Sequence, residues 1–150
     1  DVPFSGTTIS DKDSSIKQSN ISTISSSTKN KKVLYIEDVM VNIELVKHIL
    51  SLRENLTFLS ATKALSGIEI ARSELPDLIL MDLRLPDMDG ITAFKELQLI
   101  KELKHIPVIA LTANAIDGEA EKAVSLGFKN YITKPINIDI FLKVIDQLLE

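Results

Sequence analysis

Four consecutive apolar residues, residues 78–81, lead directly into the carboxylate Asp82, and this run constrains the fold more than any other stretch. Pro86 and Gly90 interrupt the chain before a helical pattern begins at Ile91. An apolar run without polar alternation is typical of a strand that is buried on both faces of a parallel sheet. Asp82 is then expected at the carboxyl end of this strand, the edge at which open α/β sheets bind ligands.

Strand-like and helix-like patterns alternate five times after residue 30. Apolar runs indicate strands at residues 33–36, 56–61, 78–81, 108–111 and 131–133. Each run is followed by apolar residues at helical spacing, the last at residues 138–149. This alternation is typical of parallel strands joined by right-handed helical crossovers. We therefore predict a flavodoxin-like (βα)5 fold, a doubly wound five-stranded parallel sheet with strand order 2-1-3-4-5.

Three residues are expected to mark helix ends. Asn42 is a candidate N-cap of the first helix. Pro76 is expected to stop the second helix, and Gly127 is a candidate left-handed terminator of the fourth. The last helix is expected to bury one apolar face that begins at Ile138.

The first 30 residues differ in composition from the rest. Thirteen of the first 28 residues are Ser or Thr and the apolar residues are isolated, so little surface can be buried to offset chain entropy. We expect residues 1–30 to form a flexible linker or tail and residues 31–150 to form one domain. A phosphorylated or partner-binding segment is the alternative for residues 1–30. Because the chain begins at Asp1, we expect it to be a piece of a longer protein.

Composition disfavours several classes of function. The chain has no cysteine, which excludes disulfides, thiolate metal sites and thiol nucleophiles. Residues 33–150 carry 12 basic and 18 acidic residues, a net charge of −6 that argues against binding nucleic acid and suits a cation or a basic partner. The sequence lacks a signal-peptide pattern and an apolar stretch long enough to span a bilayer, so we expect a cytoplasmic segment without membrane contact.

Polar residues follow four of the five predicted strands. They are Glu37 and Asp38 after the first strand, Asp82 after the third, Thr112 after the fourth and Lys134 after the fifth. Three carboxylates within about 5 Å would repel one another by roughly 3 kcal/mol per pair at an effective dielectric constant near 20. The site should therefore hold a proton or a cation. Carboxylate oxygens suit Mg²⁺, with Mn²⁺ as an alternative.

These residue types also suit phosphoryl transfer. A carboxylate can act as the nucleophile that forms an aspartyl phosphate, while a metal ion, a hydroxyl and an ammonium group neutralise the transferred group. We predict Asp82 as the nucleophile because its strand is central and has the most apolar flanks.

Each of these residues also has a structural explanation. Glu37 and Asp38 would open a surface loop, Thr112 would cap the next helix, and Lys134 would be a solvated charge. The sequence fits two roles for Tyr131 equally well: a core residue, or a residue that changes position when the domain switches between two states. His48 and His105 are isolated from other metal ligands in the sequence, so a structural or surface role is expected for both.

In combination, five features resemble the response-regulator receiver domain of two-component phosphorelays, over residues 31–150. They are the acidic pair at residues 37–38, LMD at 80–82, LPDMDG at 85–90, LTANA at 111–115 and YITKPI at 131–136. The resemblance implies a phosphoacceptor switch in which Asp82 takes a phosphoryl group from a phosphohistidine in a Mg²⁺-dependent reaction. The partner would be a histidine kinase or a histidine phosphotransfer protein.

The resemblance also implies the ligands of the metal ion. Asp38, Asp82 and the main-chain carbonyl of Arg84 would bind Mg²⁺ directly, and Glu37 would act largely through water. The domain would support its own phosphorylation and dephosphorylation without being an enzyme in the ordinary sense.

Further roles follow from the same resemblance. Lys134 and Thr112 would contact the phosphoryl oxygens. Thr112 would move toward the phosphate and Tyr131 would turn inward, which changes the face formed by the fourth helix, the fifth strand and the fifth helix. Arg84 and Asn114 lie two residues beyond Asp82 and Thr112, where side chains influence the rate of dephosphorylation.

The setting of the domain has two interpretations. The LTANA motif and the Gly127-Phe128 pair resemble receivers of hybrid sensor histidine kinases, and the Ser-rich segment lies ahead of the domain with no effector domain after Glu150. We therefore expect the C-terminal receiver of a hybrid kinase, whose own kinase core would be a candidate partner. A free-standing single-domain response regulator is the alternative.

Two other classes fit the sequence less well. A Mg²⁺-dependent phosphohydrolase that works through an aspartyl phosphate would place a second acid two residues after the nucleophile, where Arg84 stands. A nucleotide-binding or flavin-binding module would need a Gly-rich or Ser/Thr-rich loop after the first strand, where Glu37 and Asp38 stand.

Overall fold

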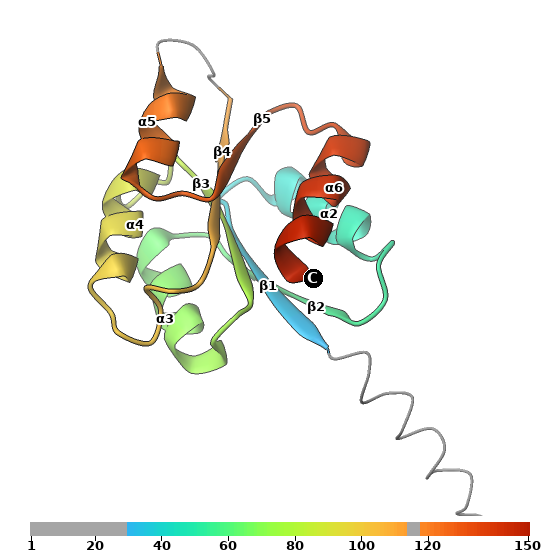
Figure 1. Ribbon diagram of the computed structural model, residues 1–150, viewed down its shortest axis with the longest axis horizontal. Coiled ribbons are helices and arrows are strands. Elements are labelled where there is room, and N and C mark those ends of the chain that lie inside the picture. The colour runs from blue at the N-terminus through green and yellow to red at the C-terminus, as the bar shows by residue number, and fades with distance from the viewer. Residues whose placement is uncertain (1–29, 114–117) are drawn as a thin grey trace, which may run out of the picture. The chain divides into compact units, whose positions relative to one another are not determined.

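Strands and helices alternate through the part of the chain that the computed structural model describes, residues 30–113 and 118–150 (Figure 1). The strands are β1 (Lys31–Ile36), β2 (Leu56–Ala61), β3 (Leu78–Asp82), β4 (Val108–Thr112) and β5 (Asn130–Thr133). The helices are α2 (Met40–Leu50), α3 (Ala64–Glu74), α4 (Gly90–Gln98), α5 (Glu119–Leu126) and α6 (Ile138–Leu149). The predicted linker, apart from Asn30, and the predicted rate-modulating residue Asn114 lie outside the described residues.

The five strands form one parallel sheet in the order β2-β1-β3-β4-β5. The predicted flavodoxin-like fold and its strand order are therefore confirmed. Ile36 of β1 pairs with Met81 of β3, so Glu37 and Asp82 follow at the same level of neighbouring strands. Asp82 in turn pairs with Leu111 of β4. The sheet thus brings the ends of β1, β3 and β4 to one edge.

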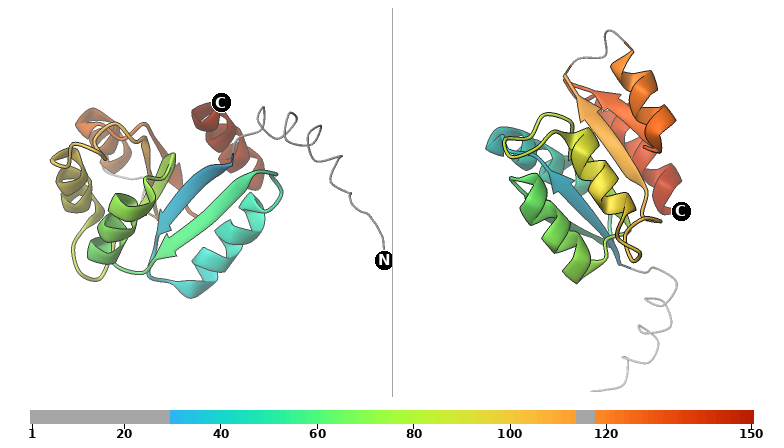
Figure 2. Two further views of the ribbon diagram at one scale, coloured as in Figure 1. Left: turned by 90° about the horizontal axis from the view of Figure 1, so that it is seen from below. Right: turned by 90° about the vertical axis from the view of Figure 1, so that its left-hand side faces the viewer.

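Helices cover both faces of the sheet, and this explains why β3 has no polar alternation. α3, α4 and α5 lie on one face and α2 and α6 on the other (Figure 1 and Figure 2). Ile79 and Met81 pack into the core under the first group, whereas Leu78 and Leu80 pack into the core under the second. None of the helices in these described residues is long and apolar enough to cross a bilayer.

Two local predictions about helices are wrong. α2 begins at Met40, and Asn42 lies inside its first turn instead of capping it. The reason is that the Val39 carbonyl already accepts bonds from the Asn42 and Ile43 amides. In α6 the buried face begins at Phe141, because Ile138 is 46% exposed at the first position of the helix. The predicted stops are confirmed: α3 ends just before Pro76 and α5 ends at a Gly127 with φ of 123°.

A residue in the loop after β3 caps the N-terminus of α3. Asp87 accepts hydrogen bonds from the backbone N–H groups of Ala64 (2.8 Å) and Leu65 (3.0 Å), which begin α3. Burial acts to raise the pKa of Asp87, but the bonds from Leu65 and Ala64 bring that pKa below its usual value. Asp87 therefore caps α3 from 23 residues away and ties that helix to the loop beyond Asp82.

We predict that Asp87→Ala lowers the free energy of unfolding by about 1 kcal/mol at pH 7, the usual effect of losing a cap. Because the folded-state pKa of Asp87 lies below its unfolded value, its contribution is present above about pH 4 and is lost as the pH falls through the folded pKa. Urea unfolding followed by circular dichroism at several pH values measures both effects. Glu54→Ala, at an exposed carboxylate, is the control. An equal loss in both variants, or a loss that persists at low pH, would contradict the capping role.

Candidate functional site

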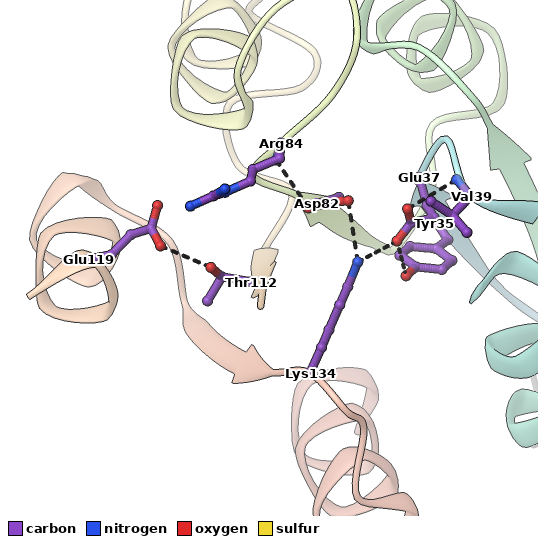
Figure 3. Close-up of polar contacts among 8 residues, drawn as sticks. All are labelled: Tyr35, Glu37, Val39, Asp82, Arg84, Thr112, Glu119 and Lys134. Carbon is purple, nitrogen blue, oxygen red and sulfur yellow. Dashed lines mark hydrogen bonds and ion pairs between the residues drawn. The ribbon is translucent and has the colours of Figure 1, made fainter. Parts of the chain in front are cut away.

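The strand ends assemble five polar side chains at one edge of the sheet. They are Glu37 and Asp38 just after β1, Asp82 at the end of β3, Thr112 at the end of β4 and Lys134 just after β5. Figure 3 draws all of these except Asp38. Parallel strands end at the same edge, which is why residues up to 97 positions apart come into contact here. The structure thus brings together the residues that the sequence singled out as a phosphoryl-transfer site.

Three carboxylates form a group that could hold a metal ion. Glu37, Asp38 and Asp82 each offer an oxygen atom, and these atoms lie within 4.8 Å of one another. Glu37 and Asp82 are buried, whereas Asp38 is exposed and opens the group to solvent. Oxygen donors of this kind fit a hard divalent cation such as Mg²⁺.

The ammonium group of Lys134 bonds to two of these carboxylates. Its Nζ atom lies 2.6 Å from Oε1 of Glu37 and 3.2 Å from Oδ2 of Asp82. Burial acts to lower the pKa of Lys134, but the Glu37 and Asp82 carboxylates raise that pKa above its usual value. With one ammonium against three carboxylates, a charge of −2 is left, which one divalent cation would neutralise. The solvated-charge explanation of Lys134 is therefore wrong.

Both carboxylate oxygens of Glu37 accept hydrogen bonds from protein donors. Oε1 accepts from the Tyr35 hydroxyl (2.8 Å) and from Lys134, and Oε2 accepts from the Val39 N–H (3.1 Å). Burial acts to raise the pKa of Glu37, but Lys134, Tyr35 and Val39 together bring that pKa below its usual value. The surface-loop explanation of Glu37 is wrong, because the side chain is fully buried.

Tyr35 is a site residue that sequence reasoning missed. It lies within the apolar run of β1, and burial followed by the neighbouring Glu37 raises the pKa of its phenol. Strand alternation could have identified Tyr35 as a site residue. Residues two apart in a strand share a face of the sheet, so Tyr35 and Glu37 point to the same side. A buried phenol next to a buried carboxylate needs that partner.

The pKa of Asp82 is raised, in contrast to that of Glu37. Burial is the largest cause, and the charge of Glu37 acts in the same direction. The Arg84 N–H donates to Oδ1 at 3.0 Å and Lys134 donates to Oδ2, but these two bonds do not offset the burial. The negative charge of Asp82 is thus less favourable in the folded protein than in water, and a further cation beside it would stabilise that charge.

Thr112 is buried at the end of β4, and its hydroxyl donates to Oε1 of Glu119 at 2.9 Å. Glu119 begins α5, and the sequence pointed to no role for it. The N-cap position of α5 is Gly118, so the alternative explanation of Thr112 as only a cap for this helix is wrong.

The remaining candidates lie outside this group of contacts. Tyr131 is 38% exposed on the edge strand β5, so it is not a core residue. His48 and His105 are both exposed, in keeping with the surface role expected for them. The Lys134-Pro135 peptide bond is cis.

We predict that Asp82→Asn raises the thermal stability of the metal-free protein at pH 7. The pKa of Asp82 is raised in the folded protein. Asp82 therefore contributes fully to stability below its unfolded-state pKa, about 3.9, and this contribution is lost as the pH rises through its folded-state pKa. At neutral pH the ionised side chain therefore opposes folding, and an amide relieves that cost. Thermal unfolding in a chelating buffer measures the change. Asp38→Asn, at an exposed carboxylate, should change the melting temperature less. A lower melting temperature for Asp82→Asn would contradict the assignment.

Added Mg²⁺ is predicted to raise the melting temperature of the wild type more than that of Asp82→Asn. At a fixed Mg²⁺ concentration, the protein that binds the ion more tightly in its folded state gains more stability. An equal shift in both proteins would place the cation elsewhere.

Known proteins with sequences similar to this one are response regulators. The family model for the response regulator receiver domain matches residues 33–146. The polar-differentiation response regulator DivK of Brucella ovis is 37% identical over 119 residues, which covers 79% of this chain and 96% of DivK.

Solved structures with this fold include two that hold a metal ion. The receiver domain of sensor histidine kinase PA1611 from Pseudomonas aeruginosa PAO1, with a magnesium ion coordinated in its active site cleft, is 28% identical with a TM-score of 0.73; the match covers 80% of this chain and 98% of that one. The Mn(2+)-bound form of response regulator Rcp1 is 26% identical with a TM-score of 0.66, over 79% of this chain and 91% of that one. The resemblance found in the sequence is thus confirmed, and the chain belongs to the response regulator receiver domain family.

Proposed function

We propose that residues 31–150 act as a signalling switch in which Asp82 accepts a phosphoryl group from a phosphohistidine on a partner protein. One observation carries this proposal: a buried carboxylate with a raised pKa lies beside an ammonium group and two further carboxylates at the sheet edge. That combination supplies a nucleophile, a fixed positive charge and the donor set of a divalent cation.

The transfer step needs the phosphohistidine, the Asp82 carboxylate and a proton from water. An Oδ atom of Asp82 forms a bond to phosphorus while the P–N bond to the imidazole breaks. The imidazole nitrogen keeps the electron pair and takes up a proton from water, so that the solvent is the one further participant. Lys134, which already bonds to Oδ2 of Asp82, and Thr112 would donate to the phosphoryl oxygens. Mg²⁺, or Mn²⁺ in its place, would supply positive charge that neutralises the phosphoryl oxygens when bound.

The proposed metal ligands are Asp38, Asp82 and the main-chain carbonyl of Arg84. We assign Glu37 an indirect role through water, and its hydrogen bonds support this: both of its oxygens already accept from protein donors. We retain Arg84 and Asn114 as residues that modulate dephosphorylation, and Tyr131 with Thr112 as the switch pair. The face of the domain that changes on phosphorylation would comprise α5, β5 and α6.

The comparisons support a proposal for the partner and the setting. DivK is named a response regulator and the PA1611 domain belongs to a sensor histidine kinase, so a histidine kinase or histidine phosphotransfer protein is the proposed donor. A free-standing regulator and the receiver of a hybrid histidine kinase fit equally well. For either setting we propose a cytoplasmic site of action and a linker role for residues 1–30. The domain would support its own phosphorylation and dephosphorylation and is not an enzyme in the ordinary sense.

Incubation with acetyl phosphate and Mg²⁺ tests the phosphoacceptor role. Intact-mass spectrometry should detect one added phosphoryl group on the wild type and none on Asp82→Asn, because the amide oxygen is a poor nucleophile. Chelation of Mg²⁺ should abolish the gain, and Glu54→Ala should label like the wild type. Labelling of Asp82→Asn at the wild-type rate would contradict the proposal.

The partner is expected to contact the amino-terminal turn of α2. Val39, Met40 and Val41 are 43%, 58% and 71% exposed, and they directly follow Asp38 in the sequence. Three consecutive exposed apolar residues are uncommon on a soluble domain and suit a protein contact. A phosphohistidine that reaches Asp82 must approach this same edge.

We predict that Met40→Glu slows transfer from a phosphohistidine donor by at least about fivefold, which corresponds to roughly 1 kcal/mol for an interface residue. Labelling by acetyl phosphate should be unchanged, because the small donor needs no docking surface. Rapid-quench transfer assays with a donor that labels the wild type measure the rate. Leu99→Glu is the control: Leu99 is 80% exposed at the far end of α4. Equal slowing by both substitutions would contradict the proposal that the donor contacts the amino-terminal turn of α2.

A further inference from the structure

The hydroxyl of Thr112 is bonded to a carboxylate on another element. It donates to Oε1 of Glu119 in the first turn of α5, at 2.9 Å (Figure 3). Thr112 ends β4, which pairs with β3 so that Leu111 lies beside Asp82. A hydroxyl carries a single proton to donate. The bond to Glu119 therefore commits the only proton that Thr112 could offer to a group on Asp82.

We propose that Glu119 is a positioning residue that competes with the phosphoryl group for the Thr112 hydroxyl, and so sets how readily the phosphorylated state is adopted. This inference rests on the proposed function. A carboxylate and a phosphoryl group are both strong, charged acceptors, so one gains the hydroxyl only as the other loses it. The free energy of the bond to Glu119 is then subtracted from that of the bond to the phosphoryl group.

The same competition would connect the site to α5. The N-cap residue of α5, Gly118, supplies no side-chain cap, and Glu119 is the residue of this helix that bonds to Thr112. Release of the hydroxyl would free the first turn of α5 from the end of β4. In Figure 3 the Arg84 side chain extends from the Asp82 loop toward Glu119, so a released carboxylate would face a guanidinium group. Phosphorylation at the end of β3 would thereby reach α5 through Thr112, whereas the hydrogen bonds described for Asp82 itself come from Arg84 and Lys134.

Titration with beryllium trifluoride, an analogue of the phosphoryl group, in the presence of Mg²⁺ tests the competition. Bound fluoride gives separate ¹⁹F NMR signals whose areas report the dissociation constant. Glu119→Ala should bind the analogue roughly threefold to tenfold more tightly than the wild type, the effect of removing one competing hydrogen bond. Glu119→Gln keeps a carbonyl acceptor for Thr112 and should show a smaller gain.

Glu121 provides a matched control. Glu119 and Glu121 are both acidic residues in the first turn of α5, so each substitution by alanine removes one negative charge from the same helix end. It is Glu119 that accepts the hydrogen bond from the Thr112 hydroxyl. Glu121→Ala should therefore leave the affinity for the analogue unchanged, and Glu119→Ala should leave the affinity for Mg²⁺ alone unchanged.

A double-mutant cycle isolates the role of Thr112. In a Thr112→Val background the gain from Glu119→Ala should vanish, because no hydroxyl is left to compete for. The inference is overturned if Glu119→Ala binds the analogue like the wild type, if Glu121→Ala tightens binding equally, or if the gain survives in Thr112→Val. If the folded, Mg²⁺-bound wild type takes up no analogue at all, the proposed function fails and the inference falls with it.

Discussion

The bonds from the Lys134 ammonium to Glu37 and Asp82 are the interaction on which this site depends. They join the end of β5 to the ends of β1 and β3, and they allow two carboxylates to be buried side by side. Without a cation between them, two buried carboxylates would repel strongly and each would lose its hydration. Lys134 neutralises only one of the carboxylate charges, so this edge of the sheet keeps a net negative charge that suits a divalent cation.

The two buried carboxylates respond differently to the same ammonium. Glu37 has a tyrosine hydroxyl and a backbone N–H in addition, and its pKa is lowered. Asp82 has fewer compensating bonds, and its pKa is raised by burial. This difference fits a division of roles in which Glu37 is a fixed structural charge and Asp82 is the reactive group. Sites that hold an unfavourable charge commonly trade stability for function.

The fold could be predicted because its determinants are local, whereas parts of the site could not. The uninterrupted apolar run of residues 78–81 requires cover on both faces of the sheet, and that requirement alone implies a parallel α/β architecture. The Asp87 cap of α3 and the bond between Thr112 and Glu119 depend on how loops and helix ends meet in space, and no periodicity in the sequence encodes that. Asn42 failed as a cap because a good capping residue three positions into a helix looks the same in sequence as one at its start.

The central claim is that Asp82 receives the phosphoryl group, and the most direct test is to locate that group chemically. Borohydride reduces an aspartyl phosphate to homoserine, which tandem mass spectrometry of peptides can place at a single position. After treatment with acetyl phosphate and Mg²⁺, we predict homoserine at position 82 alone. Homoserine at position 38, or a phosphoryl group on the intact protein with no reduction at position 82, would contradict the account.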